Sequence, residues 1–327
     1  MKIRMGLNPY GISYHLGLHA AGTPRANPKP VGLEGFLALA EEIRARAVEL
    51  SDRWLADLDD ARLEVLASRL RDADMVPIVS SGLHHGDIDA CIRYAGALGA
   101  DRIRVALTPI LCGDRAVAGE RWQELVAQTR TRLEAATPKV EAAGLTLLIE
   151  NHQDFTSREL VGFCEEFGPS VRIVYDTANS FPVAESPLDF TRVVAPYVRY
   201  LHCKDYRVQF TDEGIRLVRC PTGDGAIPFP ELFAILAEHH DEMLAAIEIG
   251  ALEARHVRLL TPDWWRGYAP KEAEALAACL LAAHRNRLSA HDEWRTPWER
   301  GEDSEIAGYE LGQLRRSVEN LKALGFM

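Results

Sequence analysis

The chain lacks the features that define several large classes of protein. Its six cysteines are scattered and form no CxxC pair, and no apolar run approaches the roughly 18 residues of a membrane span. The N-terminus also lacks the apolar core of a signal peptide. Basic residues are in the minority, with 37 Lys and Arg against 48 Asp and Glu. We therefore expect a protein of the cytoplasm with reduced thiols and with neither a membrane nor nucleic acid as its partner.

A dinucleotide-binding fingerprint is also missing, because no GxGxxG follows the first strand-like segment. This absence disfavours the open doubly wound sheet, the main rival for a chain in which strands and helices alternate. Apolar, β-branched segments predict eight strands, found in KIRMGL, ARAVEL, MVPIVSSG, RIRVAL, LTLLIE, RIVYD, VRYLHC and AAIEI.

A segment of helical periodicity follows each of these strands. The predicted helices cover Gly32–Arg46, Asp60–Ala73, the stretch from the Asp87 cap to Leu98, Glu120–Ala143 with a break at Pro138, Ser157–Phe167, Pro187–Ala195, Pro230–His239 and Lys271–Leu288. Regular alternation of this kind predicts an α/β fold, a (β/α)8 TIM barrel that occupies residues 1–290.

The tail, residues 291–327, differs from the rest of the chain. It begins with a charged and aromatic stretch and continues into a predicted helix that Ser304 caps and that ends near Leu324. A barrel does not need this C-terminal helical extension. It either packs on the outer wall of the barrel or contacts another subunit or partner.

Metal-capable side chains stand at the C-terminal ends of the last predicted strands. Glu150 ends LLIE, Asp176 ends IVYD, His202 ends YLH, and Glu248 ends AAIE. In a (β/α)8 barrel the active site lies at this edge of the strands, so these side chains should converge there. Converging carboxylates repel one another in a water-poor cavity, and a divalent cation removes that conflict.

Oxygen-rich ligation with one nitrogen suits Mn²⁺ best, with Co²⁺, Mg²⁺ and Zn²⁺ as alternatives. Without a redox partner or nucleotide fingerprint, such a cation indicates Lewis-acid chemistry next to a carbonyl. Glu150 and Glu248 come from strands well apart around the barrel, so one could remove a proton and the other return it.

Further polar residues at or near the strand ends are candidates for substrate contacts or catalysis. His152 shares a face with Glu150, and Lys204 shares a face with His202, because side chains alternate along a strand. His152 is then a base beside the metal or a hydrogen-bond partner of a ligand. The other candidates for substrate binding, each of which is otherwise a surface or ion-paired residue, are Glu49, His84, His85, Arg207 and Arg258.

The motifs LLIENH, VYDTAN, YLHCKDY with the later GDGAIPF, and IEIG resemble the xylose-isomerase-like TIM-barrel superfamily of sugar isomerases and epimerases. The resemblance spans roughly residues 7–288. It implies a divalent metal on Glu150, Asp176, His202 and Glu248, a small carbohydrate substrate, and an isomerase or epimerase that works through a metal-stabilised enediolate.

The chain departs from the pattern of ketose 3-epimerases at two places. Asn179, a further candidate for substrate binding, stands where those enzymes carry a substrate-binding His, and Thr156 stands where they carry a second Glu. The ENH and HCKD runs resemble inosose-dehydratase-like members and the catalytic subunits of C-glycoside deglycosidases more closely. That resemblance implies a lyase as the alternative, with His152 as acid or base, and a homo-oligomer with or without a small second subunit.

Two other functions compete with these enzymes. A non-catalytic sugar-binding or assembly protein could keep the barrel and lose turnover. An endonuclease of the related DNA-repair family would need a basic groove and more His ligands, and the acidic composition disfavours it.

Overall fold

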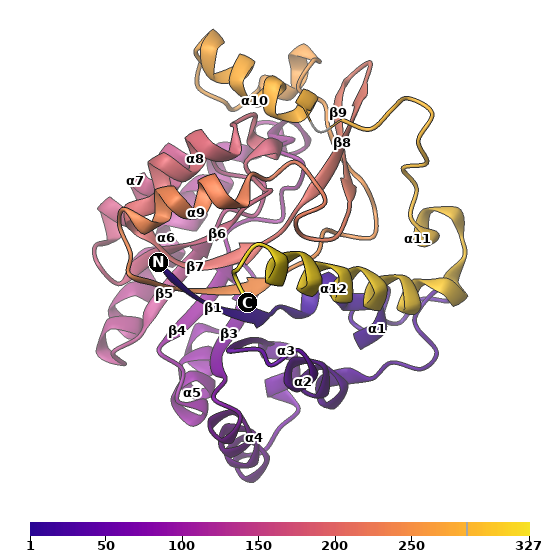
Figure 1. Ribbon diagram of the computed structural model, residues 1–327. Coiled ribbons are helices and arrows are strands. Elements are labelled where there is room, and N and C mark those ends of the chain that lie inside the picture. Colours follow the sequence, from indigo (N-terminus) through magenta and orange to yellow (C-terminus); the bar gives the residue numbers. More distant parts are fainter. Residues whose placement is uncertain (286) are drawn as a thin grey trace.

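The computed structural model describes residues 1–285 and 287–327, and within them eight parallel strands close into a barrel (Figure 1). Around the barrel the strands follow the order β1-β10-β7-β6-β5-β4-β3-β2. Their bounds are β1 Lys2–Leu7, β2 Ala47–Ser51, β3 Val76–Gly82, β4 Arg102–Ala106, β5 Thr146–Glu150, β6 Val171–Asp176, β7 Val198–Cys203 and β10 Glu242–Ile247. The predicted (β/α)8 barrel is thus confirmed, and its strands lie in the predicted segments.

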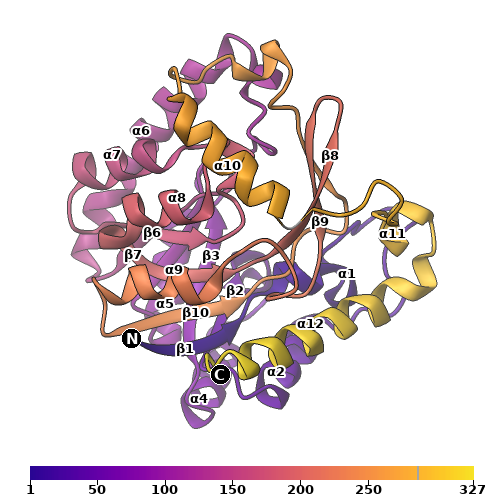
Figure 2. The same ribbon diagram turned by 45° about the horizontal axis from the view of Figure 1, so that its top comes forward.

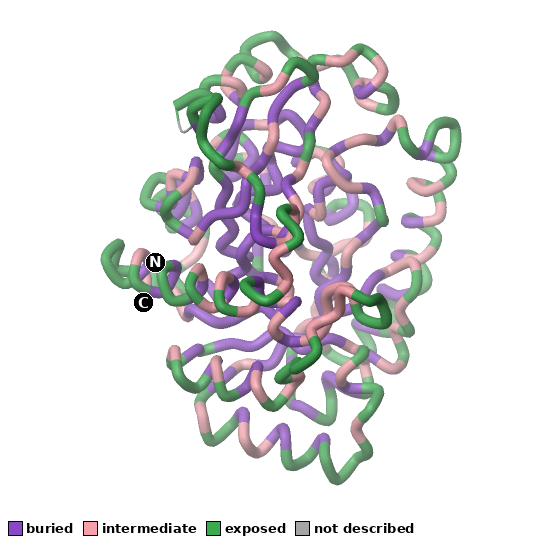
Figure 3. Tube along the Cα trace, turned by 90° about the vertical axis from the view of Figure 1, so that its right-hand side faces the viewer, coloured by how far each residue is buried: buried purple, intermediate pink, exposed green. Residues whose placement is uncertain are grey.

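Helices surround the barrel and bury their apolar stripes against it, while their outer faces stay exposed (Figures 2 and 3). Their bounds are α1 Ser13–Leu16, α2 Gly32–Glu42, α3 Asp52–Ala56, α4 Asp60–Asp72, α5 Ile88–Leu98, α6 Arg121–Ala142, α7 Ser157–Phe167, α8 Pro187–Val194, α9 Phe229–Ala237, α10 Ala273–Arg285, α11 Pro297–Arg300 and α12 Ile306–Ala323. Asp87 caps α5 as predicted, because its carboxylate accepts hydrogen bonds from the N–H groups of Asp89 and Ala90.

Helix α6 corrects the expected break at Pro138, because the helix continues through this residue to Ala142. Proline removes one N–H and leaves the carbonyl four residues earlier without its helical donor. Here that carbonyl belongs to Glu134, and both Glu134 and Pro138 are on the exposed face of the helix. Water can therefore solvate the carbonyl, and the buried face of α6 holds the helix together.

The interior of the barrel is layered, because alternate residues of each strand point inward. An apolar layer fills the middle of the barrel and consists of Ala47, Ile78, Leu148, Val174, Tyr200, Leu244 and Ala246. Two residues further along the same strands, the inward positions become polar and remain buried: Glu49, Ser80, Glu150, Asp176, His202 and Glu248. The polar layer therefore rests on an apolar floor that water does not enter, at the C-terminal ends of the strands.

A small antiparallel sheet, which the sequence analysis did not predict, lies beyond the barrel edge. It consists of β8 Tyr206–Thr211, β9 Gly214–Arg219 and β11 Arg255–Val257, in the order β11-β9-β8. The hairpin β8–β9 is inserted between β7 and α9, and β11 follows β10 in a stretch that we expected to be a loop. Figure 1 shows the hairpin standing out beyond the C-terminal ends of the barrel strands.

The C-terminal extension lies along the outside of the barrel near the start of the chain (Figure 2). Helix α12 packs against α1, and the carboxylate of its Glu310 accepts hydrogen bonds from the N–H groups of Tyr14 (3.2 Å) and His15 (2.7 Å). At its other end, Ser317 accepts from the N–H of Thr222 at 2.9 Å. The extension therefore joins the loop after β1 to the loop after β9.

The predicted Ser304 cap is wrong. Ser304 lies in a 3-10 turn, Asp303–Glu305, and α12 begins after Glu305 without a side-chain cap. The turn leads directly into the helix, so backbone continuity replaces the capping hydrogen bond. Within the described residues, no helix is both long enough and apolar enough to cross a bilayer.

We expect Glu310→Ala to lower the free energy of unfolding by about 1–3 kcal/mol, because the change leaves buried N–H groups of α1 without an acceptor. Urea denaturation measures the effect. The matched control is Glu319→Ala, which removes an exposed carboxylate of the same helix whose partner among the described residues is Arg316, at 3.6 Å. Equal stability of the two variants would contradict a fastening role for Glu310.

Candidate functional site

The side chains of Glu150, Asp176, His202 and Glu248 meet at the C-terminal mouth of the barrel. All of them are buried, and one ligand atom from each lies within 4.8 Å of the others. The geometry of the barrel explains why these side chains converge, because β5, β6, β7 and β10 are consecutive neighbours around it. In the register of β6 and β7, Asp176 lies directly opposite His202. This is the set of residues that the sequence predicts as metal ligands, and its geometry could hold one ion.

Two oxygen atoms of this cluster are left without hydrogen-bond partners among the described residues. They are Asp176 Oδ1 and Glu248 Oε2, and both are buried, although Glu248 Oε2 lies 2.8 Å from His202 Nδ1 and pairs with the ring when that nitrogen carries a proton. A buried carboxylate oxygen without a donor is costly, and a bound cation satisfies it. The carboxylate of Glu49 also contacts this cluster. When His202 is neutral, the cations Lys204 and Arg104 balance all but two of the carboxylate charges. One divalent cation restores neutrality, so the residues present fit such an ion.

Glu49 orients the imidazole of His202. Its Oε2 lies 2.7 Å from Nε2 of the ring, and this contact turns Nδ1 toward Glu248 (2.8 Å) and Glu150 (3.3 Å). Although burial opposes it, these carboxylates hold the pKa of His202 well above its ordinary value. A bound metal would replace the proton on Nδ1, since a ligating imidazole is neutral. A contact such as that from Glu49, made to the ring nitrogen that does not face the metal site, fixes the orientation of a ligating histidine.

Lys204 and Arg104 are buried cations that balance the carboxylates. The Lys204 ammonium donates to Asp176 Oδ2 and, at 2.6 Å, contacts Glu248 Oε1. The Arg104 guanidinium donates to Glu150 Oε2 and lies 3.8 Å from Glu49. These cations keep Glu248 and Glu150 ionised even though burial works against it.

The carboxyl groups of the cluster differ in pKa. Against the burial penalty, Lys204 and His202 hold the pKa of Glu248 at about 2, and Arg104 holds that of Glu150 well below its ordinary value. Burial dominates at Asp176 and raises its pKa to about 7. In the absence of a metal, Asp176 is thus the carboxylate whose ionised form is the least stabilised by its surroundings.

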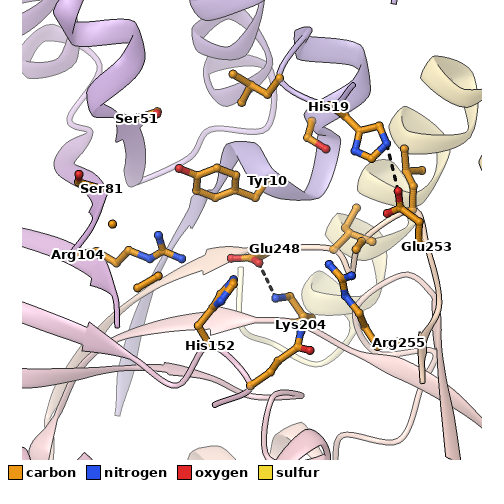
Figure 4. Close-up of a pocket in the computed structure, with 18 of the residues that line it drawn as sticks. Tyr10, His19, Ser51, Ser81, Arg104, His152, Lys204, Glu248, Glu253 and Arg255 are labelled. Atoms are coloured by element: carbon orange, nitrogen blue, oxygen red, sulfur yellow. Dashed lines mark ion pairs between the residues drawn. The ribbon is translucent and has the colours of Figure 1, made fainter. Parts of the chain in front are cut away.

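A cavity of about 720 Å³ opens directly above the cluster (Figure 4). Of the predicted site residues, Glu248, His152, Lys204 and His85 line it. Its walls come from the loops after β1, β2, β3 and β5 and from the small sheet. The size and polarity of the cavity are suitable for a small polar molecule such as a sugar.

His152 reaches the cavity two residues beyond Glu150, as the alternation of the strand predicts. Burial lowers its pKa to about 4, so the imidazole is neutral near pH 7. Its Nδ1 atom has no hydrogen-bond partner among the described residues. The ring can therefore take or give a proton on the cavity side.

Other predicted site residues lie outside the cavity lining. His84 turns away to hydrogen-bond Thr129 of α6 at 3.1 Å. Asn179 is fully buried and donates to Asp176 Oδ2 at 2.6 Å, so it holds a carboxylate of the cluster.

The two arginines predicted as substrate contacts are also placed elsewhere. Arg207 is exposed on β8, and Arg258 pairs with Asp114 (2.8 Å) and Asp263 (3.1 Å). The structure does not bring either arginine to the cavity.

Several residues that line the cavity were missed by the sequence analysis: Tyr10, Ser51, Asp52, Arg104 and Arg255. A signal for Arg104 exists in the sequence, because RIRVAL contains two arginines and Arg104 is the one inside the strand segment, between Ile103 and Val105. Ser51 ends β2, Asp52 begins α3 and Tyr10 lies in a 3-10 turn, Pro9–Ile12. Arg255 lies in the unexpected strand β11, where periodicity gives no information about direction.

A family model described as the xylose isomerase-like TIM barrel matches residues 37–279, about three quarters of the chain. The chain therefore belongs to the xylose isomerase-like TIM barrel family, as the motifs of its sequence indicated.

A relative found among curated proteins is the uncharacterized protein YihM of Escherichia coli strain K12. It is 26% identical over 217 residues, which are 62% of this chain and 61% of that protein. The match thus covers less than two thirds of the relative's length.

Solved structures of similar fold are more distant in sequence. The probable 3-DHS dehydratase AsbF of Bacillus anthracis is 14% identical, with a TM-score of 0.54 over 76% of this chain and 92% of that one. A D-psicose 3-epimerase is 14% identical, with a TM-score of 0.53 over 96% and 99%. The IOLI protein, solved with a zinc atom, has the same identity and TM-score over 88% and 96%. These similarities show the shared fold.

If the cluster binds a divalent cation, Mn²⁺ added to chelator-treated protein should raise the melting temperature. At a concentration of 100 times the dissociation constant the gain is about 2.7 kcal/mol. Glu248→Gln and Asp176→Asn should lose most of this gain in differential scanning fluorimetry, because each removes a ligand charge.

The matched control is Glu242→Gln, which changes an exposed carboxylate at the opposite end of β10, paired with Lys2 at 3.2 Å. It should keep the full shift. A shift that persists in the Asp176 and Glu248 variants would place the ion elsewhere.

Proposed function

We propose that the protein is a divalent-metal-dependent sugar isomerase or epimerase that moves a proton at a carbon next to a carbonyl. The observation that carries this proposal is the convergence of Glu150, Asp176, His202 and Glu248 beneath a polar cavity that also contains neutral His152. The small carbohydrate substrate, Mn²⁺ as the resident ion, a cytoplasmic location and a homo-oligomeric state belong to the same proposal.

A divalent cation in this cluster supplies Lewis acidity, which polarises the carbonyl and hydroxyl oxygens of a sugar and acidifies the C–H bond next to them. The remaining tasks are to orient the sugar, exclude water and move the proton. The apolar layer under the cluster excludes water from below. Lys204, whose ammonium reaches the cavity, lies where it can face negative charge that develops on a substrate oxygen.

We assign the proton transfers to Glu248 and His152. Both line the cavity, whereas the carboxylate of Glu150 is held by Arg104 and does not reach the lining. Glu248 is ionised and His152 is neutral near pH 7, so either group can accept a proton. Glu150 is then a ligand in this proposal and takes no part in the transfer.

A lyase acting on a keto-sugar is the second candidate, and His152 is the observation that favours it. The same deprotonation next to the carbonyl leaves a carbanion that can expel a group from the β carbon. His152, once it has accepted the proton from carbon and become an imidazolium, could then deliver it to the departing oxygen or carbon, in a dehydratase or in the catalytic subunit of a 3-keto-C-glycoside deglycosidase. Asn179, which faces Asp176, leaves the cavity without the sugar contact expected of a ketose 3-epimerase.

We expect His152→Asn to lower kcat by about 10²–10⁴-fold, because general acid–base groups contribute that much. Glu248→Gln should lose at least as much. The assay follows metal-loaded protein with keto-sugars and sugar phosphates in D₂O, and counts deuterium at carbon by mass spectrometry. His84→Asn is the matched control, since His84 contacts Thr129 outside the cavity, and it should keep its activity.

Exchange without loss of a group supports the isomerase or epimerase. Release of water or of an aglycone from a 3-keto substrate would contradict the isomerase or epimerase and support the lyase. Tight sugar binding without deuterium exchange into any of these substrates would contradict an enzymatic function and indicate a sugar-binding protein.

A further inference from the structure

Arg255 is an arginine in the wall of the cavity that has no partner among the residues the structure describes. It lies on β11, which follows β10 in the chain and pairs with β9, and Figure 4 shows its guanidinium pointing into the space beside Lys204. Within the described residues it forms neither a hydrogen bond nor an ion pair, and its Nε is buried without an acceptor. Two other arginines line the cavity: Arg104 is paired with carboxylates, and Arg53 is exposed to solvent.

The neighbouring carboxylate in this wall, Glu253, forms no ion pair with Arg255 within the described residues. It lies beside His19, at 3.5 Å from the Nε2 atom of that ring (Figure 4). Inside the cavity, Glu248 is occupied by Lys204 and His202. A half-buried guanidinium without a counter-charge loses hydration and gains nothing in return. Because a divalent cation would neutralise the cluster below, the positive charge of Arg255 would still remain unbalanced.

The backbone around Arg255 fixes its position. In the antiparallel ladder between β11 and β9, Arg255 pairs with Leu217 and Val257 pairs with Ile215. Leu217, Val257 and Ile215 are buried, so the strand that carries the guanidinium is anchored in the core. A rigid guanidinium offers parallel N–H donors that match the two oxygens of a carboxylate or a phosphate.

We propose that Arg255 binds an anionic group of the substrate, a carboxylate or a phosphate, so that the enzyme acts on an acidic sugar. This inference rests on the proposed function, because it specifies the substrate class for the same cavity. It replaces Arg207 and Arg258, the arginines that the sequence suggested for this role. The reacting end of the sugar would lie near Glu248 and His152, and its charged end would lie against the small sheet.

Isothermal titration of metal-loaded protein with three probes of one carbon skeleton tests this inference. The probes are D-fructose, D-fructuronate and D-fructose 6-phosphate. At least one anionic probe should bind about 10-fold or more tightly than D-fructose, and the tighter one identifies the group as carboxylate or phosphate. Arg255→Gln should weaken that probe by about 10–100-fold, as expected for a lost charge-assisted pair. Binding of D-fructose should stay unchanged.

Arg207→Gln is the matched control, because Arg207 belongs to the same sheet but is exposed and outside the cavity. Arg255→Lys should keep part of the preference, since a lysine retains the charge without the forked donors. Unchanged D-fructose binding also shows that the Arg255→Gln variant is folded. Equal or undetectable binding of all three probes to the wild type, or an unchanged preference in Arg255→Gln, would overturn the inference.

The failure of this inference differs from the failure of the proposed function. Deuterium exchange into D-fructose at the same rate in wild type and in Arg255→Gln, with no gain for the anionic probes, would keep the function and remove the role of Arg255. A preference for anionic probes that depends on Arg255, without exchange into any substrate, would keep the binding site and remove the proposed chemistry.

Discussion

Repulsion among buried carboxylates is the constraint around which the barrel mouth is built. Glu150, Asp176 and Glu248 lie close together where hydration is weak, and their charges would force them apart without compensation. Lys204 and Arg104 supply part of the compensation, and the oxygens left without donors mark the place of the rest. A divalent cation would complete the balance, and the same cation would make a sugar C–H acidic.

The architecture holds this arrangement in place through simple periodicity. Parallel strands alternate inward and outward residues, so an apolar layer and a polar layer follow each other two residues apart along each strand. The apolar layer keeps water away from the cluster, and the closed barrel fixes the distances between strands. The C-terminal helix acts further out. It fastens the loop after β1, which supplies Tyr10 to the cavity, through the carboxylate of Glu310.

Sequence alone predicted the barrel and the ligand cluster, because both follow from short periods that one strand or helix displays by itself. Prediction from sequence failed where the local structure depends on contacts with residues distant in the chain. The hairpin β8–β9 was taken for a loop, and Arg255 was missed because no pattern shows which way β11 faces. Pro138 was expected to break α6, but exposure of its turn to water removes the penalty. Arg104 could have been noticed as a charge in the middle of a short strand. The roles of the individual site residues stay predictions.

Anomalous diffraction from crystals soaked in Mn²⁺ tests the central claim most directly. Data collected on both sides of the manganese absorption edge should show one peak, at ligand distance (~2.1–2.3 Å) from Glu150, Asp176, His202 and Glu248. The ammonium of Lys204 should remain paired with the carboxylates beside the peak. A cluster without a peak at saturating Mn²⁺, or a peak bound by other residues, would contradict the account.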